Sequence, residues 1–70
     1  MSLSKHVTTT FVYEPHREWY KVEFEVFSDC VHVTGIFDQD GGMVSHDLWE
    51  ELITTADATA QEWAELEGIL

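Results

Sequence analysis

Apolar and polar residues alternate along the first half of the chain. In residues 5–13, 18–27 and 30–37, apolar side chains occupy every second position over much of each segment, the pattern of a β-strand with one buried face. From residue 47 onward the apolar residues recur every three or four positions, which predicts an amphipathic helix. Strands followed by a helix indicate an α+β domain.

The turns between the predicted strands determine how the strands pair. Ser28 and Asp29 form a two-residue turn, and residues 14–17 form a four-residue turn that contains Pro15. With these loop lengths, the apolar residues of neighbouring strands lie directly opposite one another on the same face of the sheet. A register slip of one residue would place apolar residues opposite polar ones throughout. We therefore expect a three-stranded antiparallel meander, to which residues 43–45 add either a short fourth strand or a coil crossing. The predicted pairs are Val26 with Val31, Phe24 with Val33, Tyr20 with Phe37, Phe11 with Tyr20, Thr9 with Val22 and Val7 with Phe24.

The predicted C-terminal helix begins at Asp47, which forms a capping box with Glu50. Its apolar stripe keeps its phase through residues 54–59, where helix propensity is low. This continuity favours one helix over two, although Thr59 and Glu62 fit a second capping box. The stripe comprises Leu48, Trp49, Leu52, Ile53, Ala56, Ala60, Trp63 and Leu66.

The helix stripe and the apolar face of the sheet each need a partner. Packing one on the other satisfies both and gives a single domain over residues 1–70. The predicted core comprises Val7, Phe11, Tyr20, Val22, Phe24, Val26, Val31, Val33, Phe37, Leu48, Leu52, Ile53, Ala56, Trp63 and Leu66.

The charge of the chain narrows the classes of partner. The formal net charge is −11, because 14 carboxylates face only three basic residues, Lys5, Arg17 and Lys21. No Lys or Arg follows Val22. Binding to DNA, RNA or an anionic membrane needs Lys and Arg, so we expect none of these partners. A basic protein surface would be attracted.

The motifs that carry chemistry are incomplete. Residues 38–42 fail as a calcium loop, because Met43 stands at the glycine position and Trp49 at the position of the bidentate glutamate. The four histidines show no paired metal-ligand spacing, and residues 45–47 hold Ser, His and Asp as neighbours, which cannot meet as a catalytic triad does. We therefore predict no metal, no cofactor and no catalytic residue, and a protein that is not an enzyme.

The cellular location is predicted from three features of the sequence. Cys30 is the lone cysteine and cannot form an internal disulfide, which suits a reducing compartment. The first ten residues contain no apolar segment typical of a secretion signal. No apolar run approaches the roughly 20 residues of a membrane-spanning helix. The expected location is the cytoplasm.

The outer face of the sheet carries a second candidate surface. The predicted register places Val12 opposite Trp19, with Ile36 diagonally near, on the face that the helix leaves uncovered. Apolar clusters with an aromatic anchor often mark contact sites. Contact with a second copy or a partner, and plain exposure, are both consistent with this cluster.

Three explanations of the acidic helix remain open: solubility, a high-salt habitat and docking on a basic partner. Solubility explains net negative charge but not the absence of bases, since surface helices usually mix signs to form i,i+4 pairs. We favour a non-catalytic interaction or accessory domain that docks on a basic protein surface. The alternatives are a halophile-type acidic structural domain without a charge-specific partner, and an enzyme subunit whose site another chain completes. The expected contact residues are Glu50, Glu51, Asp57, Glu62 and Glu65 on the helix, and Trp19, Val12 and Ile36 on the sheet.

Overall fold

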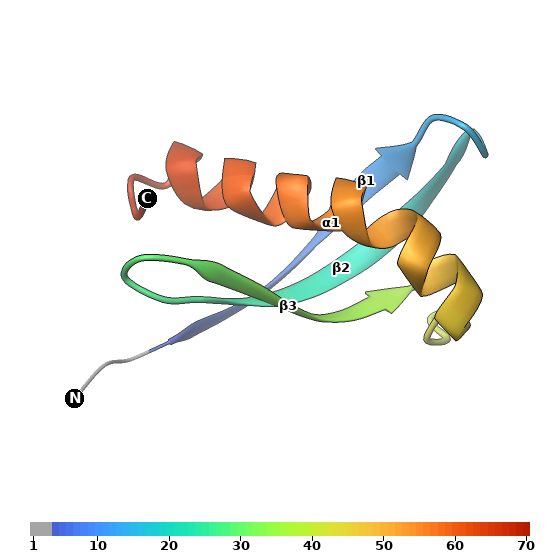
Figure 1. The fold of residues 1–70 in the computed structure, drawn as a ribbon, viewed down its shortest axis with the longest axis horizontal. Coiled ribbons are helices and arrows are strands. Elements are labelled where there is room, and N and C mark those ends of the chain that lie inside the picture. The colour runs from blue at the N-terminus through green and yellow to red at the C-terminus, as the bar shows by residue number, and fades with distance from the viewer. Residues whose placement is uncertain (1–3) are drawn as a thin grey trace.

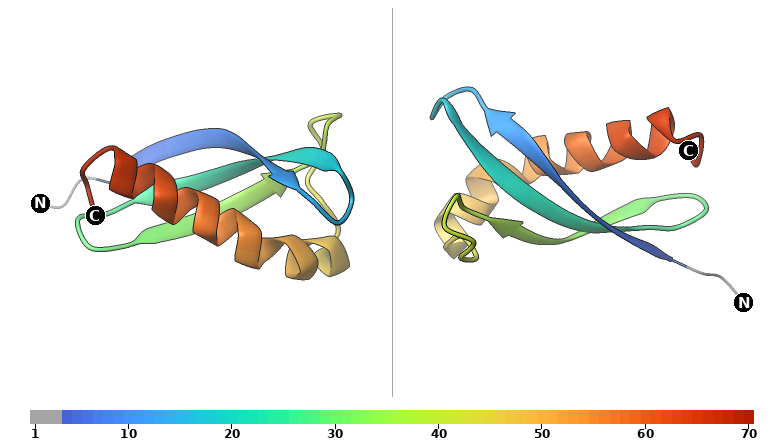
Figure 2. Two further views of the ribbon diagram at one scale, coloured as in Figure 1. Left: turned by 90° about the horizontal axis from the view of Figure 1, so that it is seen from above. Right: turned by 180° about the vertical axis from the view of Figure 1, so that it is seen from behind.

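The computed structural model describes residues 4–70 and shows one open sheet with one helix packed on it (Figure 1). The strands β1 (Lys5–Tyr13), β2 (Glu18–Val26) and β3 (Val31–Phe37) pair antiparallel in the order β1-β2-β3. The helix α1 (His46–Leu66) covers one face, and no described element covers the other (Figure 2). The α+β fold with a three-stranded meander is confirmed. Among the described residues, no helix is long and apolar enough to span a membrane.

The pairing of β1 with β2 follows the predicted register along its whole length. Phe11 lies opposite Tyr20, and Val7 lies opposite Phe24. The four-residue turn is closed by two backbone hydrogen bonds of 3.1 Å, from the amide of His16 to Tyr13 and from that of Arg17 to Glu14. Arg17 adopts a left-handed conformation (φ 53°), which completes the reversal of the chain.

The pairing of β2 with β3 departs from the prediction halfway along. Val26 lies opposite Val31 and Phe24 opposite Val33, as predicted, but a register shift follows between Glu23 and Phe24. Thr34 is the extra residue, because Val33 faces Phe24 and Gly35 already faces Glu23. Such a β-bulge reverses the facing of every later residue in its strand relative to a regular ladder.

The bulge overturns two predictions about the end of β3. Ile36 lies opposite Val22 and is fully buried, so the prediction that it lies on the outer face is wrong. Phe37 lies opposite Lys21 instead of Tyr20 and is absent from the core. Its ring covers Gly35, where an added Cβ would come within 2.8 Å of the Phe37 ring. Both residues are apolar, so hydrophobicity alone did not show which one faces inward.

The core lies between the sheet and α1, which packs chiefly against β3. Small side chains at every fourth position, Ala56, Ala60 and Ala64, let the helix approach the sheet closely, because they add little bulk between the two layers. The buried core residues are Phe11, Tyr20, Val22, Phe24, Val26, Ile36, Leu52, Ala56, Ala60 and Ala64. Around them pack the partly buried Val7, Tyr13, Val31, Val33, Val44, Leu48, Trp49, Ile53, Trp63 and Ile69.

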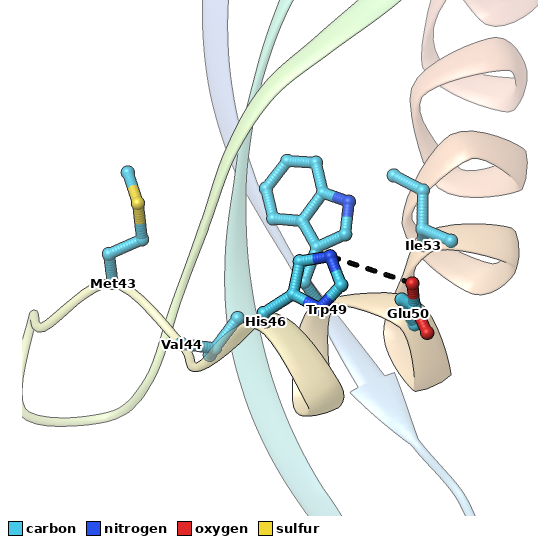
Figure 3. A pocket seen from close by; sticks show the side chains of 6 residues that line it. All are labelled: Met43, Val44, His46, Trp49, Glu50 and Ile53. Carbon is cyan, nitrogen blue, oxygen red and sulfur yellow. Dashed lines mark ion pairs between the residues drawn. The ribbon is translucent and has the colours of Figure 1, made fainter.

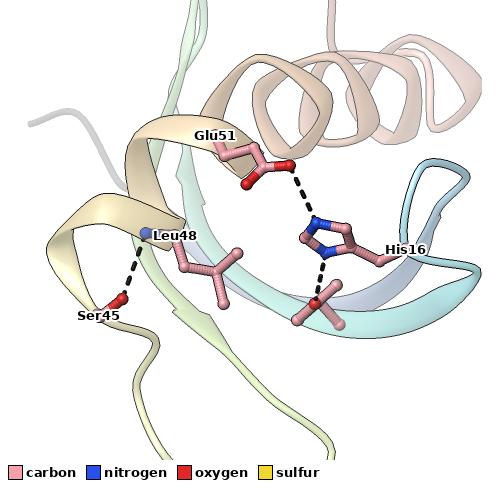
Figure 4. Close-up of polar contacts among 5 residues, drawn as sticks. His16, Ser45, Leu48 and Glu51 are labelled. Carbon is pink, nitrogen blue, oxygen red and sulfur yellow. Dashed lines mark hydrogen bonds and ion pairs between the residues drawn. The ribbon is translucent and has the colours of Figure 1, made fainter.

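The helix begins earlier than predicted and is continuous. Ser45 is its N-cap, and the Ser45 hydroxyl accepts a hydrogen bond of 3.3 Å from the amide of Leu48 (Figure 4). The predicted cap at Asp47 is wrong. Asp47 lies instead in the first turn, where a carboxylate interacts favourably with the helix dipole. The helix runs unbroken through residues 54–59, as predicted.

The helix ends in a Schellman motif, which corrects the prediction for Leu66. The amides of Gly68 and Ile69 donate to the carbonyls of Glu65 and Ala64, at 3.0 and 2.9 Å, and Gly68 adopts a φ of 78°. This reversal brings Ile69 back against the core. Leu66, predicted to be buried, is 78% exposed, because the core-facing residue of the last turn is Ala64.

The connection from β3 to α1 is a polar turn with one β-bridge. Asp38 Oδ1 accepts hydrogen bonds of 3.0 Å from the amides of Asp40 and Gly42. Met43 then forms a single bridge with Phe37, and the amide of Val44 donates to Ile36 at 3.0 Å. Residues 43–45 therefore cross by coil with one bridge and add no fourth strand.

Candidate functional site

The five acidic residues predicted on the helix lie in three different environments. Glu51 contacts the turn between β1 and β2. Glu50 lies at the rim of an apolar groove near the start of α1. Asp57, Glu62 and Glu65 line a shallow depression further along the helix. The structure thus separates residues that the sequence pattern had grouped on one face.

Glu51 belongs to a polar cluster that fastens the turn to the helix. Its carboxylate lies 3.0 Å from Nε2 of His16 (Figure 4). Nδ1 of His16 lies 3.1 Å from the Tyr20 hydroxyl, and the Tyr13 ring meets the imidazole edge-on at 4.9 Å between centroids. A neutral imidazole satisfies both contacts when Nε2–H donates to Glu51 and Nδ1 accepts from Tyr20. The cluster joins β1, the turn, β2 and α1.

The order of hydroxyl, imidazole and carboxylate in this cluster is that of a catalytic relay, but its electrostatics oppose this role. Burial raises the pKa of the Tyr20 hydroxyl, and the negative charges of Glu18, Glu51 and Asp38 raise it further. Burial also raises the pKa of Tyr13, followed by the charge and hydrogen bond of Glu51. A nucleophile needs the opposite shift. The residues of the cluster line neither the apolar groove nor the shallow depression. Their contacts connect the turn to the helix, and the cluster is called the latch below.

The depression beside Asp57, Glu62 and Glu65 forms the acidic surface of the domain. Its volume is about 810 Å³, and Thr54, Ala58 and Gln61 complete its floor and walls. Leu66, which is 78% exposed, lies at its end. An exposed aliphatic side chain is thus bordered by carboxylates, an arrangement that offers one apolar contact within a negative field. The name acidic surface denotes Asp57, Glu62, Glu65 and Leu66 together.

A second groove lies at the N-terminal end of α1 and was not predicted. Met43 and Val44 form one wall, and His46, Trp49, Glu50 and Ile53 form the other, around a volume of about 560 Å³ (Figure 3). The apolar periodicity placed Trp49 and Ile53 in the apolar stripe of the helix, and Ile53 also in the predicted core. In the structure both are only partly buried. No sequence pattern indicated this groove, because its lining comes both from the helix and from the connection before it.

Each contact within 4.0 Å between a basic and an acidic side chain among the described residues uses a histidine, which is charged only when it is protonated. His6 lies 3.7 Å from Glu23, His16 3.0 Å from Glu51, and His46 3.5 Å from Glu50. Lys5 lies over the Trp63 ring, with its ammonium 5.4 Å from the centroid. Within residues 4–70, no Lys or Arg side chain lies within 4.0 Å of a carboxylate, so Asp57, Glu62 and Glu65 have no cationic partner.

The outer face of the sheet retains part of the predicted apolar cluster. Val12 lies opposite Trp19 in the register, and the two are 57% and 46% exposed. Ile36 is lost from this cluster to the core, and Phe37 takes the outward-facing position nearby. The side-chain amide of Gln39 donates to the backbone carbonyl of Trp19 and holds the end of β2. The predicted pair is therefore exposed without Ile36.

The remaining chemistry-bearing side chains are dispersed. Among the described residues, no three His, Cys, Asp or Glu side chains are grouped to hold a metal ion. Cys30 is exposed before β3, and partial burial raises the pKa of its thiol, followed by a hydrogen bond to Asp29 and the charge of that residue. A raised thiol pKa lowers the thiolate fraction and hence the reactivity.

These features define a small acidic α+β domain with a bulged three-stranded sheet and an acidic helix. Comparison of the chain with known protein families, with curated proteins and with solved structures gave no match. Its function is therefore inferred from the geometry of the chain itself.

Proposed function

We propose that this protein is a non-catalytic interaction domain that docks on a basic protein surface through its helix. The acidic surface, together with Glu50, would make the contact. Glu51 has no direct part in it, because His16 already holds its carboxylate at 3.0 Å. The exposed lone thiol of Cys30 favours a reducing, cytoplasmic setting for this role.

The observation that carries the proposal is the set of unpaired carboxylates around an exposed leucine. Asp57, Glu62 and Glu65 line one depression with Leu66 at its end, and none has a cation within 4.0 Å in the described chain. A partner segment with Lys or Arg around an apolar side chain would match both the charge and the exposed aliphatic surface. Complementary charge of this kind speeds association and selects partners.

The position of these carboxylates is unfavourable for the isolated helix, which supports the same proposal. Glu65 lies in the last turn of α1, which contains no basic residue. The helix dipole makes the C-terminal end negative, so an acid there is destabilising by a few tenths of a kcal/mol. A basic partner would remove this repulsion on binding.

The test compares two triple charge reversals that change the net charge equally. One variant carries Asp57→Lys, Glu62→Lys and Glu65→Lys on the acidic surface. The control variant carries Glu14→Lys, Asp29→Lys and Asp40→Lys, at exposed loop positions. Proteins captured by the wild-type chain in extracts of its native host are purified and titrated against all three chains.

Docking on the acidic surface predicts that only the first reversal abolishes binding. Wild-type affinity should also fall steeply with salt, because the Debye length shrinks from about 30 Å at 0.01 M to about 10 Å at 0.1 M. Equal loss in both variants would refute a defined surface and leave net charge alone as the cause of attraction. Capture of no basic protein would also refute the proposal.

Adaptation to high salt is the second candidate, and the ion pairs favour it specifically. All three pairs use histidine, so within residues 4–70 no Lys or Arg side chain is paired with a carboxylate. This explanation predicts unfolding or marked loosening below roughly molar salt, where self-repulsion is no longer screened. Full stability at low salt, measured by urea unfolding, would eliminate it and leave the docking proposal intact.

Self-association through the outer sheet face is a separate proposal, supported by the exposed pair of Val12 and Trp19. Trp19→Ser should convert any dimer to a monomer in sedimentation. An unchanged mass in that variant would reject this contact.

A further inference from the structure

The groove at the N-terminal end of α1 differs in character from the acidic surface, which lies further along the helix. Met43 and Val44 come from the connection after β3, whereas His46, Trp49, Glu50 and Ile53 come from the first turns of the helix (Figure 3). Its volume of about 560 Å³ falls in the range of sites that take a compact organic group.

The lining is apolar and the rim is charged. Met43 is 64% exposed, and the partly buried Trp49 and Ile53 complete an indole, thioether and aliphatic surface. Glu50 lies at the rim, where its ion pair is with His46 at 3.5 Å. The His46 side chain is 82% exposed, and a solvent-exposed pair of this kind contributes little and is readily replaced by a stronger cation.

We propose that this groove binds a single apolar side chain of the partner, flanked by Lys or Arg. The apolar group would lie between Met43, Trp49 and Ile53, and a flanking cation would replace His46 at Glu50. The face of the Trp49 indole adds a further attraction for a nearby cation. This inference rests on the proposed docking function and adds to it a specific anchor.

Charge selects this occupant over the others. Asp47, Glu50 and Glu51 are the acidic residues of the first two helical turns, and no Lys or Arg follows Val22 in the sequence. A second copy of the chain would bring another strongly acidic surface to the rim and be repelled. An uncharged apolar ligand would make the apolar contacts of the groove but no ionic contact with Glu50.

Three blocked pentapeptides serve as probes. The first has phenylalanine flanked by two arginines on each side, the second has glycine in place of phenylalanine, and the third has phenylalanine flanked by serines. Each is titrated into the isotope-labelled full chain at low salt, and the indole N–H signal of Trp49 reports on the groove in NMR spectra.

The arginine peptide with phenylalanine should bind at least about tenfold tighter than its glycine counterpart, a difference of about 1.4 kcal/mol, because the aromatic side chain leaves water. Met43→Ser removes an apolar wall at an exposed position and should bring that ratio toward one. Leu70→Ser is the matched control, since Leu70 is 41% exposed and lines neither the groove nor the acidic surface, and should leave the ratio unchanged. Glu50→Gln should lower the affinity of both arginine peptides.

Each contrary outcome identifies the part that fails. If the two arginine peptides bind the wild-type chain equally, and the triple charge reversal of the acidic surface abolishes this binding, the anchor is overturned. The docking proposal then stands. Equal binding of the arginine and serine peptides that contain phenylalanine overturns the basic occupant. Absence of binding by both arginine peptides overturns the anchor and the docking proposal together.

Discussion

Truncation of Ile36 tests the bulge in β3, because the bulge alone decides whether this side chain is buried. In the structure Ile36 is fully buried opposite Val22, whereas a regular ladder would expose it beside Trp19. Ile→Ala at a buried site costs about 2–5 kcal/mol, and Ile→Val about 0.5–1.5 kcal/mol. At an exposed site either change stays within about 0.5 kcal/mol. The two registers therefore predict clearly different outcomes.

The size of the effect relative to total stability determines the assay. A chain of 70 residues has an unfolding free energy of about 3.5–10 kcal/mol at roughly 0.05–0.15 kcal/mol per residue. Ile36→Ala could remove most of this, so Ile36→Val provides the measurable variant if the alanine chain does not fold. Urea unfolding, followed by far-ultraviolet circular dichroism, gives the midpoint and slope of each variant.

The controls compare positions that the two registers exchange. Val12→Ala, at a residue 57% exposed, should change the unfolding free energy by no more than about 0.5 kcal/mol. Phe37→Ala should cost less than Ile36→Ala, since Phe37 covers Gly35 outside the core. If Ile36→Val is as neutral as Val12→Ala while Phe37→Ala is the costlier change, the bulge is absent and the regular register is correct.

Three further predictions concern the ends of α1 and the latch. Ser45→Ala should lower the unfolding free energy in urea by about 1 kcal/mol through loss of the cap, whereas Asp47→Asn should cost only a few tenths; the reverse order would restore the predicted cap. Gly68→Ala should cost about 1 kcal/mol in the same assay, because an alanine is strained at a φ of 78°, and a neutral result would argue against the Schellman turn. The pKa of the Tyr20 hydroxyl is raised, so its ultraviolet titration should lie above that of free tyrosine at pH 10. Its contribution to stability is complete below pH 10 and is lost as the pH rises through the folded pKa, and unfolding measured against pH should lack this loss in Tyr20→Phe.

The sequence was sufficient to predict those parts of the fold in which apolar residues recur with a regular period. Alternation and loop length predicted the whole β1–β2 register and the first half of β2–β3, because each face of these strands has one character. The continuous phase of the apolar stripe likewise predicted one helix across residues 54–59. In these segments a wrong register would expose several apolar residues at once, so the pattern has one solution.

Prediction failed where neighbouring residues have the same character. Ile36 and Phe37 are both apolar. The bulge at Thr34 determines which of the two faces the core, and the apolar pattern does not reveal it. Ser45 and Asp47 both suit an N-cap, and tertiary packing decides which residue starts the helix. These choices depend on contacts between segments distant in sequence, which periodicity does not record.

The candidate site was predicted as a set of residues but not as a geometry. The helix pattern placed the carboxylates away from the core, which is all that periodicity specifies. It did not separate Glu51, held by His16 across the turn, from Asp57 and Glu65, which have no cationic partner in the described chain. The groove beside Trp49 depends on where the connection after β3 lies relative to the helix, and one sequence offers no pattern for that.

The carboxylates of the helix differ in whether they contact a basic side chain, and this difference predicts opposite effects of neutralising them. Glu51 contributes a contact to the latch, so Glu51→Gln should weaken the folded state. Asp57, Glu62 and Glu65 contribute no ion pair, so replacing them with Asn or Gln should leave the unfolding free energy unchanged or raise it by a few tenths of a kcal/mol per residue. Such an increase at low salt would show that these acids oppose folding and that their use lies outside the fold. A clear decrease would mean that they stabilise the helix itself, and a basic partner would no longer be needed to explain them.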